Sequence, residues 1–385
     1  MHVVHIITDL DLGGAEMMLL RLVSATYPQR FTSTVINLSK RGVISPRIEA
    51  LGVEVHELGL SPGKPDPIRL ARLASWLRKL RPDVIQTWMY HADLIGSVAA
   101  SLARPGRGPI PVVWGIHNST LDPARSKRST MQVVRQLARL SWKTPHKIIS
   151  CSQVARDIHV NSGYAAAKMT VIPNGFDLEL YHPQPGGRQD LQDELGLAGP
   201  VRLAGVVARY DPQKDYPNFL QAAALVSRQQ ANVHFVCCGS RVDENNADLL
   251  ALIRQHGLTG RVHLLGQRDD VPRLAAAFDV LVTASAYGEA FPLVVGEAMA
   301  CETPCVVTDV GDSGLLVGDT GQVVPPRDPQ SLAAGMSAIL SLPQDDLQEL
   351  GRRARRRISA HFSLAQTVQL YEEVYRETLH SAQAG

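Results

Sequence analysis

Long apolar runs and a large net charge are both missing from this sequence of 385 residues. No stretch reaches the roughly 18 apolar residues that a membrane-spanning helix needs, and the N-terminal segment contains Asp9 and lacks the basic start of a signal peptide. The formal net charge is +2, so general electrostatic binding of nucleic acid is not expected. These absences predict a cytoplasmic protein that contacts a membrane only peripherally, from its inner face.

Cysteines are few and show no disulfide pattern. The five of them, an odd number in a long chain, are Cys151, Cys237, Cys238, Cys301 and Cys305. This usage is typical of reduced cytosolic thiols. Cys301 and Cys305 have no histidine or cysteine partner at zinc-ligand spacing. We therefore expect neither a metal site nor a bound cofactor.

Short β-branched runs alternate with helical patterns along the whole chain. This alternation predicts an α/β fold with parallel sheets whose two faces are covered by helices. Strands are predicted at 2–8, 34–38, 53–58, 83–87, 111–116 and 148–150, and then at 201–207, 233–236, 262–265, 280–284 and 305–308. The stretch from Tyr181 to Asp190, with two prolines and two glycines, predicts a linker between two domains, 1–182 and 183–361.

Glycine-rich and aromatic loops follow two strands of the predicted first domain. Gly13 and Gly14 come between a strand and a helix, where a phosphate can approach the backbone and the helix N-terminus. A purely structural tight turn fits these glycines equally. Trp88, Tyr90 and His91 follow another strand, at the edge where open α/β sheets bind ligands. His91 also fits an ordinary polar helix start.

His117 stands at the end of the predicted strand 111–116. An imidazole there can donate to a substrate oxygen or act as an acid or base. A capping or core-edge histidine fits the same position, so the residue alone leaves both interpretations open.

The predicted second domain carries its charged groups on two such loops. Arg209 and Lys214 follow its first strand, and these two side chain types bind phosphate as a planar fork and as a compact charge. The stretch SAYGEAFPLVVGE follows a later strand and places Glu289 and Glu297 on either side of a turn. A carboxylate can accept hydrogen bonds from neighbouring sugar hydroxyls. The alternatives are an exposed basic loop and two solvated helix charges.

The turn between these glutamates predicts the start of a helix. It consists of Phe291, Pro292, Leu293 and Val294. The free backbone N–H groups and the positive dipole end of a helix favour a phosphate at this point. Sugar, phosphate and ribose groups are therefore all expected near this turn.

Segment 101–150 is strongly basic, with nine lysines and arginines against Asp122 as its one acid. The cations are Arg104, Arg107, Arg125, Lys127, Arg128, Arg135, Arg139, Lys143 and Lys147. Within it, residues 131–142 predict an amphipathic helix that ends at Trp142. Such a helix is typical of contact with an anionic membrane surface, and also of a solvated face. The arginine run at 352–357 is interpreted as a solvated helix face.

With these residues in view, the chain resembles the retaining glycosyltransferases of family 4, the glycosyl transferases group 1. The resemblance rests on Gly13 to Glu16, His117, Ile172 to Gly175, Arg209 with Lys214, and Ser285 to Val307. It implies the GT-B fold, in which two Rossmann-like domains face each other across a cleft. It also implies that a C-terminal helix, residues 362–385, crosses back to the first domain.

The resemblance further implies a role for each motif residue. Glu297 would hold the ribose and Glu289 the donor sugar. Arg209 and Lys214 would neutralise the diphosphate, assisted by amides of Gly14 and of the 291–294 turn. His117 would lie against the transferred sugar, and the backbone at Gln267 and Arg268 would read the base. One departure from the family pattern is Ala290, where a glycine is more usual, so the backbone there must avoid φ values that alanine disfavours.

The expected activity is transfer of a sugar from a nucleotide diphosphate donor, a UDP-sugar, to an acceptor hydroxyl with retention of configuration. A lipid-linked saccharide is the expected acceptor, bound near Trp88, Tyr90 and His91 in the first domain. A sugar-nucleotide epimerase, a phosphorylase and a non-catalytic nucleotide-sugar binding protein remain as alternatives.

Overall fold

The computed structural model describes residues 1–26, 31–61, 66–103, 110–122 and 127–384 and divides into two compact units. Unit 1 comprises Met1–Gly175 together with Leu364–Gly385, and unit 2 comprises Phe176–Ser363. The linker expected from Tyr181 onward begins later in the chain than this division. The cations Arg104, Arg107 and Arg125 of the basic segment lie outside the described residues.

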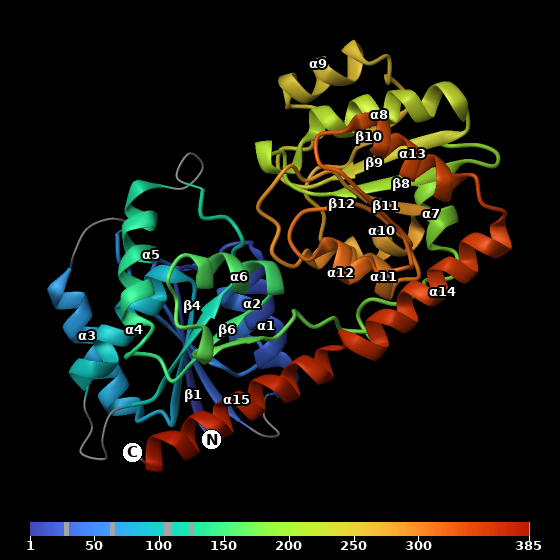
Figure 1. Ribbon diagram of the computed structural model, residues 1–385. Coiled ribbons are helices and arrows are strands. Elements are labelled where there is room, and N and C mark those ends of the chain that lie inside the picture. Colours follow the sequence, from blue (N-terminus) through green and yellow to red (C-terminus); the bar gives the residue numbers. More distant parts are fainter. Residues whose placement is uncertain (27–30, 62–65, 104–109, 123–126, 385) are drawn as a thin grey trace. The chain divides into compact units, whose positions relative to one another are not determined.

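Unit 1 is built on a sheet of seven parallel strands in the order β3-β2-β1-β4-β5-β6-β7. Figure 1 labels β1, β4 and β6 of this sheet. Its strands are β1 (His2–Ile7), β2 (Thr32–Asn37), β3 (Glu54–Glu57), β4 (Val84–Trp88), β5 (Val112–Ile116), β6 (Lys147–Ser150) and β7 (Met169–Val171). Crossover helices join successive parallel strands, as in doubly wound folds.

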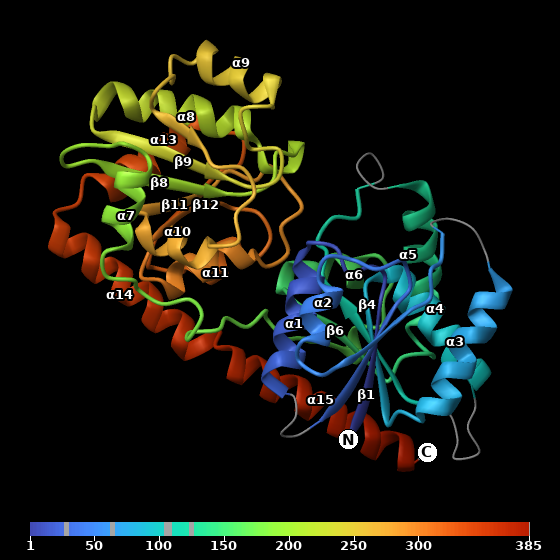
Figure 2. The ribbon, with the colours of Figure 1, turned by 180° about the vertical axis from the view of Figure 1, so that it is seen from behind.

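Helices cover both faces of this sheet. The helices are α1 (Gly14–Thr26), α2 (Ser45–Glu49), α3 (Pro67–Leu80), α4 (Tyr90–Ala103), α5 (Arg128–Leu140), α6 (Gln153–Asn161) and the C-terminal α15 (Leu364–Ala384). One core cluster joins the sheet to α1, α2 and α15, and the other joins it to α3, α4 and α5 (Figure 2). The predicted return of the C-terminal helix to the first domain is confirmed, because α15 buries Val368, Tyr371 and Tyr375 in the first of these clusters.

Unit 2 repeats the architecture with six parallel strands in the order β10-β9-β8-β11-β12-β13. They are β8 (Arg202–Val207), β9 (Val233–Cys238), β10 (Val262–Leu264), β11 (Val280–Thr283), β12 (Cys305–Thr308) and β13 (Gln322–Val324). Figure 1 shows the helices on the two sides of this sheet. They are α7 (Gly187–Glu194), α8 (Tyr216–Gln229), α9 (Ala247–Gln255), α10 (Val271–Ala277), α11 (Leu293–Ala300), α12 (Ser313–Val317), α13 (Pro329–Leu340) and α14 (Gln344–His361). The predicted two-domain α/β fold is confirmed.

The arginine run of α14 is only partly the solvated face that we predicted. Arg355 donates to the carbonyl oxygens of Leu178, Tyr181 and Ala300, and Arg357 donates to those of Leu315 and Leu316. The guanidinium groups therefore bind backbone carbonyls within unit 2. This use of the run depends on contacts that the local pattern does not reveal.

All five cysteines are free thiols and all are buried. Burial raises the pKa of Cys238 to about 11 and that of Cys301 to about 12. Across the described ranges no helix is long and apolar enough to cross a bilayer.

Candidate active site

The strand order reverses at one point in each sheet, between β1 and β4 in unit 1 and between β8 and β11 in unit 2. Ligands of doubly wound sheets bind beyond the carboxyl ends of the strands at such a point. In unit 2, Arg209 and Lys214 follow β8, and the stretch from Ser285 to Glu297 follows β11. Of the predicted donor-binding residues, Arg209, Lys214 and Glu289 thus lie on the two loops that border the reversal in unit 2.

These two loops are joined through Glu289. The Lys214 ammonium contacts Oε1 of Glu289, and the Ser285 hydroxyl donates to the same oxygen at 2.6 Å. The amide of Ala286 donates to the carbonyl of Gln213 at 2.8 Å. The Lys214 and Glu289 side chains are only 19% and 12% exposed. A cation and an acid are therefore held together in a largely desolvated position.

The turn before α11 leaves its helix N-terminus without a side-chain cap. Pro292 is the N-cap residue and its side chain accepts no hydrogen bond from the helix. Backbone N–H groups at Leu293 and Val294 are among those that an α-helix leaves unsatisfied in its first turn. Phe291 and Glu297 are both buried, at 4% and 8% exposure. An anion at this turn would meet backbone donors and the positive helix end.

Ala290 fits this turn because its φ is not positive; Gly288 and Gly311 have the positive φ values, 80° and 61°. A methyl group built on Gly311 would clash with the carbonyl oxygen of Glu289. The Asp312 amide also donates to the Ala290 carbonyl at 3.0 Å. The loop after β12 therefore supports the Glu289 backbone by close approach at a glycine.

Arg209 is exposed, with half of its side chain accessible, at 53%. Its guanidinium is within 3.2 Å of the Gln213 amide oxygen and 3.4 Å of Asp211. Such long, exposed contacts are easily exchanged for a ligand phosphate. The side chain of Arg209 is therefore available to a ligand at this loop.

Arg268 instead belongs to an ion-pair cluster. Its guanidinium contacts Asp270 at 2.8 Å and Glu194 at 2.7 Å, and Arg273 contacts the same two acids. Hydrogen bonds from Arg268 and Arg273 hold the pKa of Asp270 well below its usual value, so Asp270 is ionised. The cluster fixes the loop, and Gln267 beside it is exposed. Base reading by the backbone at Gln267 and Arg268 remains a proposal.

In unit 1, Gly13 directly precedes α1 and Gly14 is the first residue of that helix. A methyl group built on Gly14 would meet no atom within 4 Å, whereas one on Gly13 would clash with the Glu16 carboxylate. Burial raises the pKa of Glu16 to about 7, and the charges of Asp9 and Asp11 add to this effect. A carboxyl group that titrates near neutrality therefore covers the glycine turn.

Trp88 and Tyr90, two of the three residues predicted to contact an acceptor, are buried. Trp88 is 0% and Tyr90 2% exposed. The Tyr90 hydroxyl forms a buried hydrogen bond of 2.9 Å with Nε2 of His159. His91 is half-buried, and its burial and the nearby Lys127 lower its pKa. Of the three predicted acceptor residues, only His91 retains an accessible surface.

His117 follows β5 and lies on the face of Trp88, with ring centroids 5.0 Å apart. Neither of its ring nitrogens has a hydrogen-bond partner among the residues that the structure describes. Burial lowers the pKa of His117 to about 4, so the imidazole is neutral at physiological pH. A neutral ring with one N–H donor and one free acceptor is thus held at the edge of the sheet.

Two residues with a visible role in the site were not singled out from the sequence. Ser285 positions the Glu289 carboxylate, and Glu16 covers Gly13. Their signal in the sequence is position: Ser285 is the second residue after β11, and Glu16 is the second residue after the glycine pair. Neither position reveals the hydrogen bond or the fold-back of the side chain.

Each unit is a doubly wound α/β domain, and unit 2 carries the Lys214–Glu289 pair next to the point where its strand order reverses. This architecture is that of the GT-B glycosyltransferases. The chain belongs to glycosyltransferase family 4. Residues 12–180 match the family model described as Glycosyltransferase Family 4, and residues 187–357 match the one described as Glycosyl transferases group 1.

Named relatives include a glycosyltransferase of lipid-linked sugars. The chain is 26% identical over 318 residues to the UDP-Gal:alpha-D-GlcNAc-diphosphoundecaprenol alpha-1,3-galactosyltransferase of Escherichia coli, covering 80% of this chain and 78% of that protein.

Among solved structures, Anabaena Alr3699/HepE in complex with UDP is similar, with a TM-score of 0.84 and 25% identity over 98% of this chain and 100% of that chain. A HepE structure with UDP-glucose gives the same TM-score and identity over 99% of each chain. Sucrose-phosphate synthase of Thermosynechococcus elongatus, at 20% identity and a TM-score of 0.79 over 99% of this chain and 100% of that chain, shares the fold.

Proposed function

We propose that this protein is a retaining glycosyltransferase that transfers a sugar from a UDP-sugar to a hydroxyl of a lipid-linked saccharide, in polysaccharide or glycoconjugate biosynthesis. The observation that carries the proposal is the Lys214–Glu289 pair beside the uncapped N-terminus of α11. Similarity to HepE, crystallised with UDP-glucose, supports the donor. Similarity to the galactosyltransferase that acts on a diphosphoundecaprenol-linked sugar supports the acceptor.

The donor is assigned to the loops of unit 2. Glu297 accepts hydrogen bonds from the ribose hydroxyls, and Glu289 accepts them from the sugar. Arg209, Lys214 and the amides of the 291–294 turn neutralise the diphosphate. On donor binding, the Lys214 ammonium turns from Glu289 toward a phosphate oxygen, and Glu289 then accepts hydrogen bonds from the sugar hydroxyls.

Charge development explains why this set of groups accelerates transfer. As the bond between the anomeric carbon and the phosphate oxygen breaks, negative charge grows on the diphosphate and positive charge on the sugar ring. Preorganised cations and helix amides stabilise the first charge without reorganisation at the moment of reaction. In a retaining reaction the acceptor hydroxyl attacks the face that the diphosphate leaves, and the departing phosphate oxygen takes its proton.

Unit 1 contributes groups that would meet the sugar and the acceptor. The neutral ring of His117 donates its N–H to a sugar hydroxyl, and the amide of Gly14 donates to the diphosphate. His91 is the remaining candidate for acceptor contact. These assignments rest on the resemblance of the motifs to the family and on the open surface at Gly14.

A basic face on α5 is proposed to rest on an anionic membrane surface that presents the lipid-linked acceptor. Arg135 and Arg139 are exposed and have no ion pair within the part of the chain that the structure describes, while Val134 and Leu137 face the core. Trp142 is 64% exposed and its indole N–H donates to the carbonyl of Gly163 at 3.2 Å.

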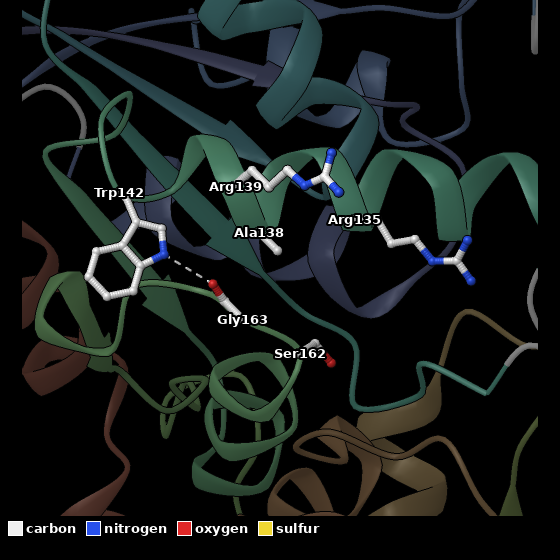
Figure 3. A pocket seen from close by; sticks show the side chains of 6 residues that line it. All are labelled: Arg135, Ala138, Arg139, Trp142, Ser162 and Gly163. Carbon is white, nitrogen blue, oxygen red and sulfur yellow. Dashed lines mark hydrogen bonds between the residues drawn. The ribbon is translucent and has the colours of Figure 1, made fainter.

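Arg135, Arg139 and Trp142 border a pocket of about 500 Å³ (Figure 3). Two cations beside an exposed indole suit lipid phosphates and the interfacial region of a bilayer. The occupant proposed for this surface is therefore the anionic headgroup layer.

The decisive experiment is a panel of UDP-, ADP- and GDP-sugars, each offered with undecaprenyl diphosphate-linked N-acetylglucosamine. The expected result is UDP release and a glycosylated lipid whose new linkage keeps the anomeric configuration of the donor. An inverted linkage would exclude the retaining mechanism. An isomerised donor in the absence of acceptor would instead identify an epimerase, and phosphate-dependent cleavage a phosphorylase.

Arg209→Ala tests whether the donor loop carries the activity. Because the side chain is exposed and makes only long hydrogen bonds, the free energy of unfolding should stay within about 0.5 kcal/mol of the wild-type value. We expect kcat/KM to fall by about a hundredfold or more. Arg254→Ala, which removes an exposed arginine from α9, is the matched control and should leave kcat/KM unchanged. Equal activities of the two variants would remove Arg209 from the mechanism.

A further inference from the structure

Two aromatic rings are stacked behind His117, and they come from different segments of unit 1. The ring of His117, after β5, lies on that of Trp88, the last residue of β4, at an interplanar angle of 23°. Trp88 also stacks with Tyr371 of α15, with centroids 6.0 Å apart and an interplanar angle of 14°. The C-terminal helix therefore reaches the candidate site through a continuous stack.

The central ring of this stack is fixed by a hydrogen bond. Nε1 of Trp88 donates to Nδ1 of His5 at 3.3 Å. His5 is buried, and burial with the charge of His2 lowers its pKa to about 3, so it stays a neutral acceptor. The indole plane is thus set by β1, the strand next to β4.

The backbone directly after Trp88 is also constrained. Met89 has a φ of 72°, in the left-handed region that side chains other than glycine rarely adopt. Its amide donates to the carbonyl of Gly115 at 2.9 Å, two residues before His117. Strained backbone of this kind persists where the surrounding structure holds it. The ends of β4 and β5 are therefore locked to each other beside the stack.

We propose that Trp88 is a positioning residue for His117: the indole, backed by Tyr371, holds the imidazole plane in the orientation that presents its N–H to the donor sugar. The inference rests on the proposed role of His117. It follows from the contacts of the ring, since stacking orients His117 while its nitrogens have no partner among the described residues. Through the contact of Tyr371 with Trp88, the C-terminal helix α15 then supports the site.

The kinetic test compares Trp88→Leu, which removes the stack, with Trp88→Phe, which keeps a ring. Misplacement of a reacting or contacting group by about an ångström can cost up to about a hundredfold in rate. We expect kcat to fall between about tenfold and a hundredfold in Trp88→Leu, with UDP affinity by calorimetry unchanged, and to be largely restored in Trp88→Phe. The donor is the UDP-sugar selected by the panel above.

Unit 1 supplies a matched control in a second histidine–tryptophan stack. His56 and Trp76 lie 5.0 Å apart at 28°, away from the ends of β4 and β5. Trp76→Leu removes the same kind of contact and should leave kcat unchanged. A comparable loss of kcat in Trp76→Leu would show that the effect is one of general destabilisation and would overturn the proposal.

A double-mutant cycle with His117→Ala separates positioning from other effects of the core substitution. If Trp88 acts through His117, Trp88→Leu lowers kcat no further in the His117→Ala background. A loss of unchanged size in that background overturns the positioning role while leaving the role of His117 intact. If His117→Ala alone leaves turnover at the wild-type level, the proposed role of His117 fails, and the positioning role fails with it.

A measurement without substrate covers the case in which Trp88→Leu is poorly stable. The proton chemical shift of the His117 ring, followed by NMR against pH, should report a pKa near 4 in the wild type and in Trp76→Leu. In Trp88→Leu and in Tyr371→Leu the ring becomes more hydrated, and its pKa should move up toward 6.5. An unchanged titration in both variants overturns the proposal.

Discussion

Lys214 and Glu289 form an ion pair that bridges the loops after β8 and β11. The Glu289 oxygen that meets the ammonium also accepts the Ser285 hydroxyl. Both charged side chains are more than three-quarters buried, so their attraction is screened less than that of a surface pair. The acid that is proposed to hold the donor sugar is therefore oriented before any donor arrives.

Ser285→Ala should lower both turnover and stability. The substitution removes the 2.6 Å hydrogen bond to Glu289, and Lys214 still holds the carboxylate. We expect a loss of about 1 to 2 kcal/mol in the free energy of unfolding. We also expect kcat to fall about tenfold, because Glu289 can rotate about its side-chain bonds once Lys214 has turned to the diphosphate of the bound donor. Steady-state kinetics and thermal unfolding measure the two effects.

Ser337→Ala on α13 is the control for this variant, because the Ser337 hydroxyl makes only a 3.5 Å contact with Gln229. It should leave both quantities at the wild-type value. Unaltered kcat in Ser285→Ala would mean that the Ser285 hydroxyl does not orient Glu289 for catalysis.

Gly311→Ala should disturb the site through the backbone of Glu289. Gly311 has a φ of 61°, and a methyl group there would clash with the Glu289 carbonyl. Gly257 has a similar φ of 68°, with no atom within 4 Å of a built methyl group. Gly257→Ala therefore measures the cost of the left-handed conformation alone, about 1 to 2 kcal/mol.

We expect Gly311→Ala to destabilise unit 2 by more than Gly257→Ala and to lower kcat/KM, whereas Gly257→Ala leaves kcat/KM unchanged. Denaturant unfolding and steady-state kinetics on both variants provide the comparison. Equal stabilities and full activity in the two variants would show that the loop after β12 does not support the backbone of Glu289.

Much of the fold could be predicted from the sequence because parallel strands buried on both faces produce uninterrupted apolar runs, as at 203–207 and 280–282. The strand β13 was missed, since Gln322–Val324 is short and two of its three residues are exposed. The donor loops were recognisable because their residues directly follow strands, which places them at one edge of the sheet.

Trp88 shows where the local pattern fails. Its place at a strand end suggested ligand contact, but its partners His5 and Tyr371 come from the first strand and the last helix. Because these partners are distant in the chain, the sequence pattern around Trp88 does not reveal that the side chain is buried. The arginines of α14 were misjudged for the same reason, because the carbonyls that they bind lie on other segments of unit 2.

Glu16 predicts a pH dependence of donor binding near neutrality. Burial raises its pKa from 4.5 to about 7, and Asp9 and Asp11 contribute in the same direction. Glu16 is therefore mostly neutral below pH 7 and ionised above it, where its charge would oppose a diphosphate at Gly13 and Gly14. The KM for the donor should rise as the pH increases from about 6 to about 8.

Glu16→Gln should flatten this dependence, because the amide carries no charge at any of these pH values. A raised folded-state pKa also means that ionisation of Glu16 costs stability, progressively as pH rises from the unfolded value of 4.5 through about 7. The variant should therefore gain stability relative to the wild type at pH 8, by at most about 3 kcal/mol, and gain little at pH 5. Identical pH profiles of KM in the two proteins would show that ionisation of Glu16 does not affect donor binding.

Charge reversal on α5 tests the membrane surface. Arg135 and Arg139 are both exposed on one helix, and each basic side chain near an anionic bilayer contributes about 1 kcal/mol. Arg135→Glu with Arg139→Glu should therefore weaken binding to vesicles of equal parts phosphatidylglycerol and phosphatidylcholine by at least about tenfold in a flotation assay.

The wild-type binding itself should weaken as salt is raised, because exposed charges are screened within about 10 Å at 0.1 M ionic strength. The double reversal Arg228→Glu with Arg254→Glu changes the net charge equally on exposed arginines of unit 2 and should leave vesicle binding intact. If the two double variants bind alike, net charge governs the association and α5 is not the contact surface. If the wild type fails to float with these vesicles, the acceptor is presented by some route other than a lipid surface at α5.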